Sequence, residues 1–394
     1  RDIATMILFA LISLSCISAA DNTSDEIIAQ DNGINADEIV AQPDLYNEKI
    51  STGGENEISD FSTLNAEIAN STTSTIQLTK NYTYNPEKDS NYTDGIVIDK
   101  PDFTIDGQGH TINGAGLARI FNITTNTVTL KNINFLNGNA TDSGAAIYWY
   151  GDNGTINNCN FTNNQAKLRG GAVFWCGVNG TINDSNFINN TATRYSGVAI
   201  QWDSNSANGT INNCNFTNNQ GSQRGGAIYW NSVNGRIDNS NFVNNTSIDG
   251  GALFCDSNAP DGYVNNSNFI ENNGNDGGAI YWEGENGIVN NSKFINNTGF
   301  NGGAISWQKR HGLVNNCNFM NNQADNGGAV YWEGSNSTLT TCNFTNNQAD
   351  NGGAIYWYAY NGITNNSSFT NNQADNGGAI YWNAYNGTIN DSHL

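Results

Sequence analysis

The stretch Gly225-Gly-Ala-Ile-Tyr-Trp230 decides the fold of this chain, because it returns at nearly constant spacing. Related copies begin at Gly170, Gly277 and Gly352. Between copies runs a second block, such as Asn153-Gly-Thr-Ile-Asn-Asn-Cys-Asn-Phe-Thr-Asn-Asn164. Its Phe stands at 135, 161, 187, 216, 242, 269, 294, 319, 344 and 369, in steps of 26, 26, 29, 26, 27 and then four times 25. A period this regular predicts one structural unit per repeat.

Each repeat contains three short stretches that favour β-strands and none with helical period. In the copy that ends at Phe242 they are Ala227-Ile-Tyr-Trp230, Arg236-Ile and Ser240-Asn-Phe242. About 25 residues with three strands is too short for a propeller blade and matches one coil of a β-solenoid. Since one coil cannot bury its own apolar face, stability must come from the stacking of neighbouring coils. We therefore predict an all-β parallel β-helix.

The columns of the repeat separate into core and surface. The position of Ile228 holds only Ile, Val or Leu and must point inward. Because side chains alternate along a strand, Trp230 should also point inward and Tyr229 outward. Cys255 is the one exception in the Trp column. The Asn pairs at 157–158, 212–213, 265–266 and 315–316 should form a corner and an amide ladder, and the Gly pair should form another corner.

The ends of the chain differ from the repeats. Residues 1–20 are predicted to be a signal peptide, although Cys16 leaves a lipoprotein signal open. Residues 21–57 read as an acidic, disordered linker. Residues 58–140 are expected to form an N-terminal cap and first irregular coils, with a short capping helix at Phe61-Ser-Thr-Leu-Asn-Ala-Glu-Ile-Ala69. Residues 141–394 are the regular β-helix repeats, and the last coil is expected to continue beyond Leu394.

Composition limits the possible partners. The 394 residues carry a net charge of −21, whereas nucleic-acid binding needs a basic surface that neutralises phosphates. We therefore expect no nucleic-acid partner. An acidic, sparsely charged surface is compatible with neutral glycans or cationic partners. The histidines are scattered at 110, 311 and 393, so no metal site, cofactor or catalytic residue is predicted.

Charged residues recur from coil to coil in the turn before the Gly pair. This turn is expected to stack charged residues over successive coils, namely Lys167, Arg169, Arg194 and Arg224, then Asp249 and Asp276. A basic patch beside an acidic one could bind an acidic sugar, but we favour a variable turn, which is Asn in later coils.

Four cysteines share a column otherwise filled by Ser and should face the core: Cys159, Cys214, Cys317 and Cys342. The last two could pair in a secreted protein, yet in-register parallel side chains rarely meet disulfide geometry, so free thiols are favoured.

The outward Tyr column is the candidate binding surface. Coils stack about 4.8 Å apart, so outward rings would form a stripe on which sugar rings or a partner's apolar patch could stack. Cross-strand packing would by itself also explain the column. The predicted ligand-binding residues are Tyr148, Tyr229, Tyr281, Tyr331, Tyr356 and Tyr381 in the column, and Tyr358, Tyr360 and Tyr385 in the loops after the Trp.

Two tetrapeptides carry a resemblance to known families. Gly-Gly-Ala-Ile and Phe-x-x-Asn alternate once per coil, which resembles polymorphic outer-membrane protein repeats. Thr104-Ile-Asp-Gly-Gln-Gly-His-Thr-Ile112 is similar to the N-terminal coils of pectin-lyase-like β-helices. Together, over about residues 58–394, they resemble adhesin-like surface proteins of methanogenic archaea. The resemblance implies a right-handed parallel β-helix on the cell surface, used for attachment.

The sequence therefore predicts a secreted, cell-surface adhesin-like protein. Its expected partners are extracellular glycans or surface proteins of other cells, and no membrane span is expected after cleavage of the signal. The alternative is a pectin-lyase-like polysaccharide lyase or glycoside hydrolase. Such sites need paired carboxylates, or a Ca²⁺-binding carboxylate set with a basic residue. No such constellation stands out in the repeats, so a binding protein is predicted rather than an enzyme.

Overall fold

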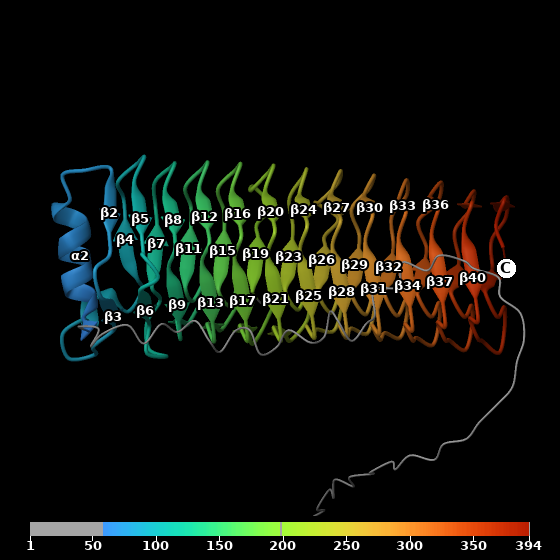
Figure 1. Ribbon diagram of the computed structural model, residues 1–394, viewed down its shortest axis with the longest axis horizontal. Coiled ribbons are helices and arrows are strands. Elements are labelled where there is room, and N and C mark those ends of the chain that lie inside the picture. The colour runs from blue at the N-terminus through green and yellow to red at the C-terminus, as the bar shows by residue number, and fades with distance from the viewer. Residues whose placement is uncertain (1–57, 198, 394) are drawn as a thin grey trace, which may run out of the picture. The chain divides into compact units, whose positions relative to one another are not determined.

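The computed structural model describes residues 58–197 and 199–393, so the predicted signal peptide and acidic linker lie outside the described residues. Three long sheets contain thirteen, thirteen and twelve strands, and a short fourth sheet has four. Neighbouring strands are parallel and come from successive coils. Figure 1 shows the coils stacked in chain order, beginning beside α2 (Phe61–Asn70). The predicted all-parallel β-solenoid is confirmed.

We name the sheets after the residues that they bury. The phenylalanine sheet contains β1 (Ile58–Ser59), β3 (Asn81–Thr83), β6 (Thr111–Asn113), β9 (Asn134–Leu136), β13 (Asn160–Thr162), β17 (Asn186–Ile188), β21 (Asn215–Thr217), β25 (Asn241–Val243), β28 (Asn268–Ile270), β31 (Lys293–Ile295), β34 (Asn318–Met320), β37 (Asn343–Thr345) and β40 (Ser368–Thr370). The isoleucine sheet contains β2 (Thr75–Gln77), β5 (Thr104–Asp106), β8 (Thr129–Lys131), β12 (Thr155–Asn157), β16 (Thr181–Asn183), β20 (Thr210–Asn212), β24 (Arg236–Asp238), β27 (Tyr263–Asn265), β30 (Ile288–Asn290), β33 (Leu313–Asn315), β36 (Thr338–Thr340), β39 (Ile363–Asn365) and β42 (Thr388–Asn390).

The tryptophan sheet contains β4 (Ile96–Ile98), β7 (Phe121–Ile123), β11 (Ile147–Trp149), β15 (Val173–Trp175), β19 (Ile200–Trp202), β23 (Ile228–Trp230), β26 (Leu253–Cys255), β29 (Ile280–Trp282), β32 (Ile305–Trp307), β35 (Val330–Trp332), β38 (Ile355–Trp357) and β41 (Ile380–Trp382). The short sheet contains β10 (Asn139–Ala140), β14 (Gln165–Ala166), β18 (Thr191–Ala192) and β22 (Gln220–Gly221). A 3-10 turn, η2 (Ser90–Tyr92), precedes β4.

The predicted capping helix is present as α2. It buries Phe61, Leu64 and Ile68. At its start, the Asp60 carboxylate accepts from the Thr63 backbone N–H at 2.9 Å, and at its end Lys100 Nζ donates to the Ile68 carbonyl oxygen at 2.7 Å. These contacts satisfy backbone groups that a helix leaves unpaired at its ends. The helix thereby covers apolar surface that the first coils would otherwise expose.

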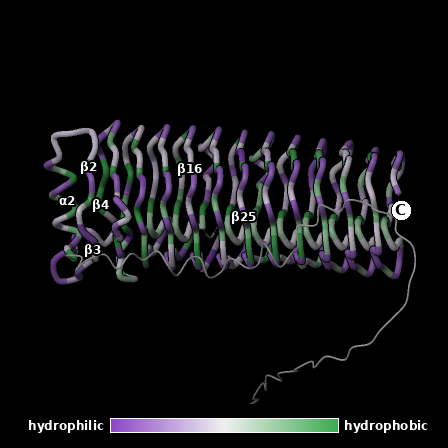
Figure 2. Tube along the Cα trace, in the orientation of Figure 1, coloured by the Kyte–Doolittle hydropathy of each residue, from purple (hydrophilic) through white to green (hydrophobic). Residues whose placement is uncertain are grey.

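Two stacks of aromatic rings fill the interior. Successive Trp rings lie 4.3 to 5.2 Å apart between centroids, as in the pairs Trp149–Trp175 and Trp307–Trp332. The Phe stack is equally regular, at 4.8 Å from Phe216 to Phe242. The inward direction predicted for the Trp column is therefore confirmed. Figure 2 shows the consequence, since apolar residues recur at matching places in every coil.

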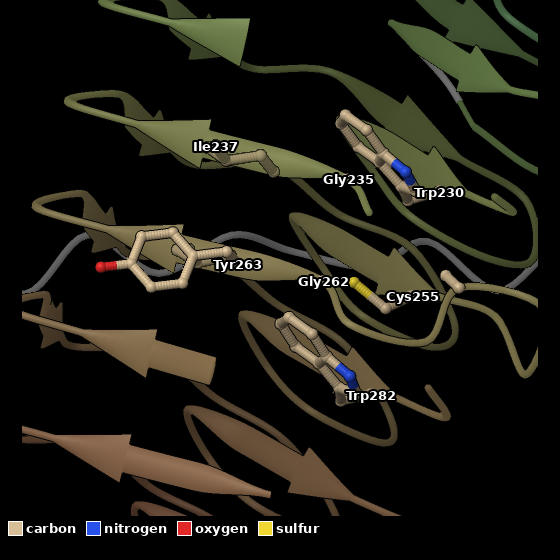
Figure 3. A pocket seen from close by; sticks show the side chains of 9 residues that line it. Trp230, Gly235, Ile237, Cys255, Gly262, Tyr263 and Trp282 are labelled. Carbon is tan, nitrogen blue, oxygen red and sulfur yellow. The ribbon is translucent and has the colours of Figure 1, made fainter. Parts of the chain in front are cut away.

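The Trp stack is interrupted at Cys255. This side chain is buried between Trp230 and Trp282, where the other regular coils place an indole (Figure 3). Ala259, from the loop after Cys255, is also buried and lines the gap. A cavity of about 10 Å³ remains, which is about the space of one water molecule. The prediction that Cys255 substitutes for Trp as an inward residue is confirmed.

A buried asparagine ladder runs along the end of the phenylalanine sheet. The Asn of each Phe-x-x-Asn motif is fully buried from Asn164 to Asn347. In the middle of the ladder, Asn272 Nδ2 donates to Asn297 Oδ1 at 3.0 Å and to the Phe242 carbonyl oxygen at 2.9 Å. Asn272 Oδ1 accepts two hydrogen bonds from Asn245, one from its Nδ2 and one from its backbone N–H, both at 3.0 Å. Each amide therefore joins three coils and has its hydrogen-bonding capacity satisfied.

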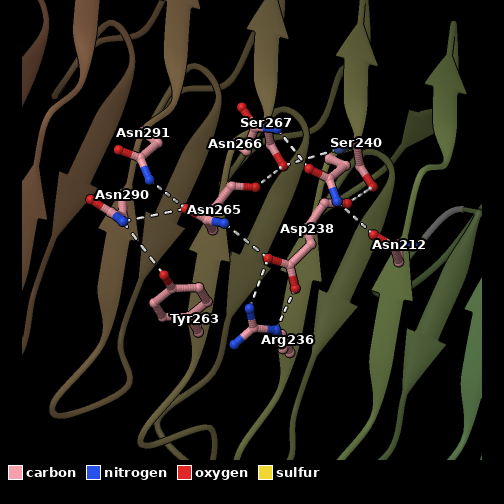
Figure 4. A network of polar contacts seen from close by, with 11 residues as sticks. Asn212, Arg236, Asp238, Ser240, Tyr263, Asn265, Asn266, Ser267, Asn290 and Asn291 are labelled. Atoms are coloured by element: carbon pink, nitrogen blue, oxygen red, sulfur yellow. Dashed lines mark hydrogen bonds and ion pairs between the residues drawn. The ribbon is translucent and has the colours of Figure 1, made fainter.

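A second, more exposed ladder lies at the corner between the isoleucine and phenylalanine sheets, as predicted. Asn266 has φ of +48°, in the left-handed region that Asn tolerates. Its Nδ2 donates to Asn239 Oδ1 at 2.6 Å, and Asn291 Nδ2 donates to Asn265 Oδ1 at 2.9 Å (Figure 4). The corner predicted for the Asn pairs is therefore confirmed.

The two residues of the Gly pair are needed for different reasons. Gly302 has φ of +70°, which forms the corner that the sequence predicted. Gly303 is constrained by its neighbour, because an added Cβ would lie 2.2 Å from the carbonyl oxygen of Gly328 in the next coil. A side chain at this position would force the coils apart.

The Cys and Ser column also faces inward, as expected. Cys159, Cys214, Cys317 and Cys342 are all buried free thiols. Burial raises the pKa of Cys159 and of Cys214 to about 12. Cys317 and Cys342 lie on neighbouring coils, and the Cys317 backbone N–H donates to Cys342 Sγ at 3.5 Å. Side chains of this column thus accept hydrogen bonds from the backbone of the preceding coil. Ser267 Oγ does the same for the Ser240 backbone N–H at 3.2 Å.

Candidate functional site

The outer face of the tryptophan sheet presents two parallel columns. The middle residue of each strand forms the aromatic column, from Tyr148 to Tyr381. The residue after each strand points to the same side because side chains alternate. These residues form the following column: Tyr150, Cys176, Asp203, Asn231, Asp256, Glu283, Gln308, Glu333, Tyr358 and Asn383. The sequence reasoning singled out only Tyr358 in this second column.

The aromatic column is divided into three runs rather than being one open stripe. Gln201 and Ser306, both buried, separate the runs. The rings pack against one another within each run, with centroids 4.9 Å apart for Tyr148–Phe174 and 4.9 Å for Phe254–Tyr281, then 5.2 Å for Tyr331–Tyr356 and 5.1 Å for Tyr356–Tyr381. Tyr229 is only 8% exposed. Ring faces in the column are therefore covered by neighbouring rings, and its edges and hydroxyl groups are what a partner can reach.

Phenol groups of the aromatic column donate to carboxylates of the following column. Tyr331 Oη donates to Glu333 Oε1 at 2.8 Å, and Tyr281 Oη donates to Glu283 Oε1 at 3.3 Å. Tyr229 Oη donates likewise to the Asp256 carboxylate. Burial, and then these carboxylates, raise the pKa of Tyr281 and Tyr331 above the ordinary tyrosine range. The phenols therefore stay protonated and hold the carboxylates in place.

This arrangement predicts a loss of stability in alkali. A phenol whose folded-state pKa exceeds its unfolded value near 10 stabilises the fold below that pH, and the contribution is lost as the pH rises through the folded-state pKa. We expect the urea midpoint to fall between about pH 9 and about pH 11. The double variant Tyr281→Phe/Tyr331→Phe should lose less stability over the same interval, because its rings cannot ionise. An equal loss in parent and variant would contradict this assignment.

Exposed tyrosines gather in the loops that follow the last Trp strands. Tyr358 is 52%, Tyr360 54% and Tyr385 75% exposed. Tyr360 and Tyr385 lie parallel at 6.0 Å, and Tyr358 lies 6.5 Å from Tyr356. We call Tyr358, Tyr360 and Tyr385 the loop tyrosines. These three residues, which the sequence proposed as ligand-binding, have ring surface open to solvent.

Tyr150 was missed by the sequence reasoning. It is 53% exposed and stacks on Tyr148 at 4.5 Å. The available signal was positional, because Tyr150 follows Trp149 just as Tyr358 follows Trp357. An exposed ring therefore lies at each end of the regular part of the sheet.

Charged side chains border the middle of this face. Backbone β-bridges join Arg224 to Ser196 in the preceding coil and to Asp249 in the following coil. A further bridge joins Asp249 to Asp276. Arg194 lies two residues before Ser196, so the prediction that it shares the column of Arg224 is wrong, because this turn has one residue more than the preceding one. Burial, followed by the Asp276 charge, raises the pKa of Asp249. In the part of the chain that the structure describes, no three His, Cys, Asp or Glu side chains converge as metal ligands.

The two best-defined cavities lie away from this face. One is the small internal cavity beside Cys255. The other, of about 390 Å³, is an open depression at the end of α2, lined by residues that include Glu67, Asn70 and Gln77. The outer face of the tryptophan sheet thus offers an extended surface of aromatic edges, carboxylates and exposed rings.

Comparisons with known families agree with the repeat analysis. Residues 55–168 match the pectate lyase-like adhesive domain. Residues 213–229, 341–356 and 366–381 match the Chlamydia polymorphic membrane protein repeat. A comparison with curated protein sequences finds no match.

Solved structures share the fold at low sequence identity. A PL6 alginate lyase in complex with a trisaccharide has a TM-score of 0.53 and 14% identity, with 86% of each chain covered. The catalytic unit of a GH87 α-1,3-glucanase from Streptomyces thermodiastaticus has a TM-score of 0.51 and 11% identity, over 76% of this chain. The present chain spans 60% of that glucanase. Identities this low show the fold alone.

No helix among residues 58–197 and 199–393 has the length and apolar character needed to cross a membrane. The matched segments cover the first coils and several of the later ones, in register with the Gly-Gly-Ala and Phe-x-x-Asn motifs. The chain is a parallel β-solenoid whose first coils match the pectate lyase-like adhesive domain and whose later coils match the polymorphic membrane protein repeat in three segments.

Proposed function

We propose that this chain is a cell-surface adhesin that binds extracellular glycans through the outer face of the tryptophan sheet. The observation that carries the proposal is the group of loop tyrosines, whose rings are half to three-quarters exposed and of which Tyr358 lies 6.5 Å from Tyr356 of the aromatic column. Exposed aromatic rings offer a large apolar surface at a small cost in side-chain entropy. The matched adhesive domain supports attachment as the role of the surface.

The polar groups of the face favour neutral sugars. Carboxylates such as Glu283 and Glu333 accept hydrogen bonds, and sugar hydroxyl groups are suitable donors. The net charge of −21 and the acidic middle of the face repel polymers of uronic acid. A neutral glycan meets no such repulsion.

Repetition compensates for weak single contacts. Coils repeat every 25 residues from Phe269 to Phe369, so a polymer that follows the stacking direction meets similar groups at regular intervals. Once one contact forms, later contacts are effectively intramolecular, and the overall affinity exceeds that of each site. An extended surface without a deep pocket can therefore retain a long glycan or a glycan-coated cell.

The loop tyrosines provide the test. The variant Tyr358→Ser/Tyr360→Ser/Tyr385→Ser should fold like the parent, because the rings are exposed, and its retention on neutral glycan arrays should fall by about two orders of magnitude. Tyr331→Ser/Tyr356→Ser/Tyr381→Ser should lose less, since these rings are half-buried. Tyr195→Ser, an exposed ring outside the face, is the matched control. Unchanged glycan retention by the first variant, with its fold intact, would place the binding surface elsewhere.

Polysaccharide cleavage is the second candidate function. One observation favours it: Asp249 has a raised pKa beside Asp276, with Arg224 in the same column. A carboxyl group with a raised pKa keeps its proton to higher pH than an ordinary aspartate and can act as a general acid. If cleavage of a glycan were measured, Asp249→Asn should abolish it while leaving glycan retention unchanged.

A further inference from the structure

The turn edge of the solenoid, which borders the proposed glycan face, carries an ordered series of charges. The tip of each turn is the second residue before the first Gly of the pair, and backbone hydrogen bonds stack the tips from coil to coil. Phe300 N–H donates to the Asn275 carbonyl oxygen at 2.6 Å, and Asp325 N–H donates to the Phe300 carbonyl oxygen at 3.1 Å. In the next coil, Asp350 N–H donates to the Asp325 carbonyl oxygen at 3.0 Å. The tips therefore form one continuous line.

The first part of this line is basic. Lys167 and Arg169 lie on either side of the tip Leu168, Arg194 precedes the next tip, Tyr195, and all three cations are exposed. None of the three makes an ion pair, whereas Lys80, Lys88, Arg119, Lys131, Arg224, Arg236 and Arg310 do so within the described residues. Three unpaired cations next to one another are unexpected in a chain of net charge −21. They form a positive segment that has no ion-pairing carboxylate among residues 58–197 and 199–393, and Arg169 lies over the Tyr195 ring at 5.6 Å.

The middle of the line is apolar and its last part is acidic. Ile248 is 52% and Phe300 47% exposed, on either side of Asn275. The next three tips are Asp325, Asp350 and Asp375, all exposed. The order along the chain is therefore basic, apolar, acidic. Asp249 and Asp276 stand one residue behind the tips, and their charges act on Tyr281 of the aromatic column.

This order is self-complementary when one copy is reversed. Consider a two-fold axis that passes through Asn275 and relates two copies of the chain. Each tip on one side of Asn275 then faces, in the second copy, the tip that lies equally many coils on the other side. Ile248 then meets Phe300 of the second copy, Gln223 and Arg224 meet Asp325, Arg194 meets Asp350, and Lys167 with Arg169 meets Asp375. Because a two-fold contact is isologous, each pairing occurs twice. A shift of the axis toward the C-terminal coils by half a coil would leave Lys167 and Arg169 without any of the three acidic tips opposite them. A shift the other way would bring Asp142 against Asp375.

The edge is straight enough to make these contacts together. Phe rings of neighbouring coils are nearly parallel, at 1° for Phe161–Phe187 and 2° for Phe319–Phe344. Other Phe pairs in this span lie at 7° and 8°, so the ring orientation is kept from coil to coil, and nine tips extend over about 40 Å. A narrow contact of this length falls at the small end of specific interfaces, so the association should be weak and sensitive to salt.

We propose that the turn edge is an antiparallel docking surface for a second copy of this chain, with the two-fold axis at Asn275. Molecules held by the same end on two facing surfaces approach each other in this orientation. The edge would thus join like cells, independently of whether the tryptophan sheet binds glycan.

Charge reversal tests the proposal on the full chain by sedimentation velocity at low salt. The parent should form dimers that dissociate as salt is added. The basic-segment variant Lys167→Glu/Arg169→Glu/Arg194→Glu should dimerise at least about tenfold more weakly, and so should the acidic-segment variant Asp325→Lys/Asp350→Lys/Asp375→Lys. An equimolar mixture of the two variants should dimerise again, because both end segments of one edge are then acidic and both end segments of the other are basic.

The matched control is Lys293→Glu/Lys309→Glu/Arg310→Glu, which changes the net charge equally away from the edge and should dimerise like the parent. Circular dichroism of each variant verifies the fold. The proposal is wrong if the parent is monomeric at low salt, if it forms open-ended assemblies, or if the mixture of the two edge variants fails to pair.

Discussion

Replacing Asn272 by alanine is expected to lower the free energy of unfolding by about 3 to 5 kcal/mol, estimated from the groups that it leaves unpaired. The substitution removes the acceptor of the Asn245 backbone N–H and the donor to the Phe242 carbonyl oxygen. Both groups are buried between coils, away from bulk solvent. Urea unfolding followed by circular dichroism measures the change.

The control for this prediction lies in the same coil. Asn268 Nδ2 also donates to an amide of the previous coil, at 2.8 Å from Asn241 Oδ1, but Asn268 is only half-buried. Water can hydrate the groups that Asn268→Ala leaves behind, so its cost should stay below about 1 kcal/mol. Equal losses for the two variants would show that burial of the ladder is not the source of its contribution.

Removing one indole from the interior should have an effect of similar size. Trp332 is fully buried and stacks on Trp307 at 5.2 Å and on Trp357 at 4.9 Å. Trp332→Ala should cost about 3 to 5 kcal/mol, because neighbouring coils are held by backbone pairing and cannot collapse into the cavity. Denaturant unfolding monitored by Trp fluorescence gives the value.

The adjacent residue provides the comparison. Tyr331 precedes Trp332 in β35 but points outward, and Ser306 already occupies the same column in β32. Tyr331→Ser should therefore cost no more than about 1.5 kcal/mol, the value of a lost aromatic contact. A larger cost for Tyr331→Ser than for Trp332→Ala would reverse the assignment of inner and outer faces.

The sequence predicted those features that repeat with strict period. Nine Trp in one column and Phe in another leave a single consistent inward face, and the capping helix followed from the spacing of Phe61, Leu64 and Ile68. Inward and outward directions could be read because strand alternation fixes them once one column is known to be apolar.

The ladder at Asn272 could not be placed from the sequence, because the chain is rich in Asn and the buried and exposed positions have the same residue type. The role of glycine before the isoleucine sheet was also hidden. A Cβ at Gly312 would lie 2.4 Å from Cε2 of Trp307, a contact between residues five positions apart that becomes visible only when the indole's direction is known.

The candidate site was predicted less completely than the fold. Their place in the loops after the Trp identified the loop tyrosines as surface residues, but column position could not show that rings such as Phe254 and Tyr281 cover one another. Nor did it reveal the carboxylates of Glu283 and Glu333, since charged residues after a strand are common on solvent-exposed loops. These features depend on distances between coils, which spacing along the chain does not contain.

The central claim is that the tryptophan sheet retains a glycan without cleaving it, and one measurement tests this directly. The purified chain is incubated with the neutral polysaccharide that it retains best on the array, and the polymer is then released and sized by chromatography. We predict full recovery of the polymer at its original length, with no new reducing ends or unsaturated products. Progressive shortening that stops in Asp249→Asn would contradict the account and identify the protein as an enzyme.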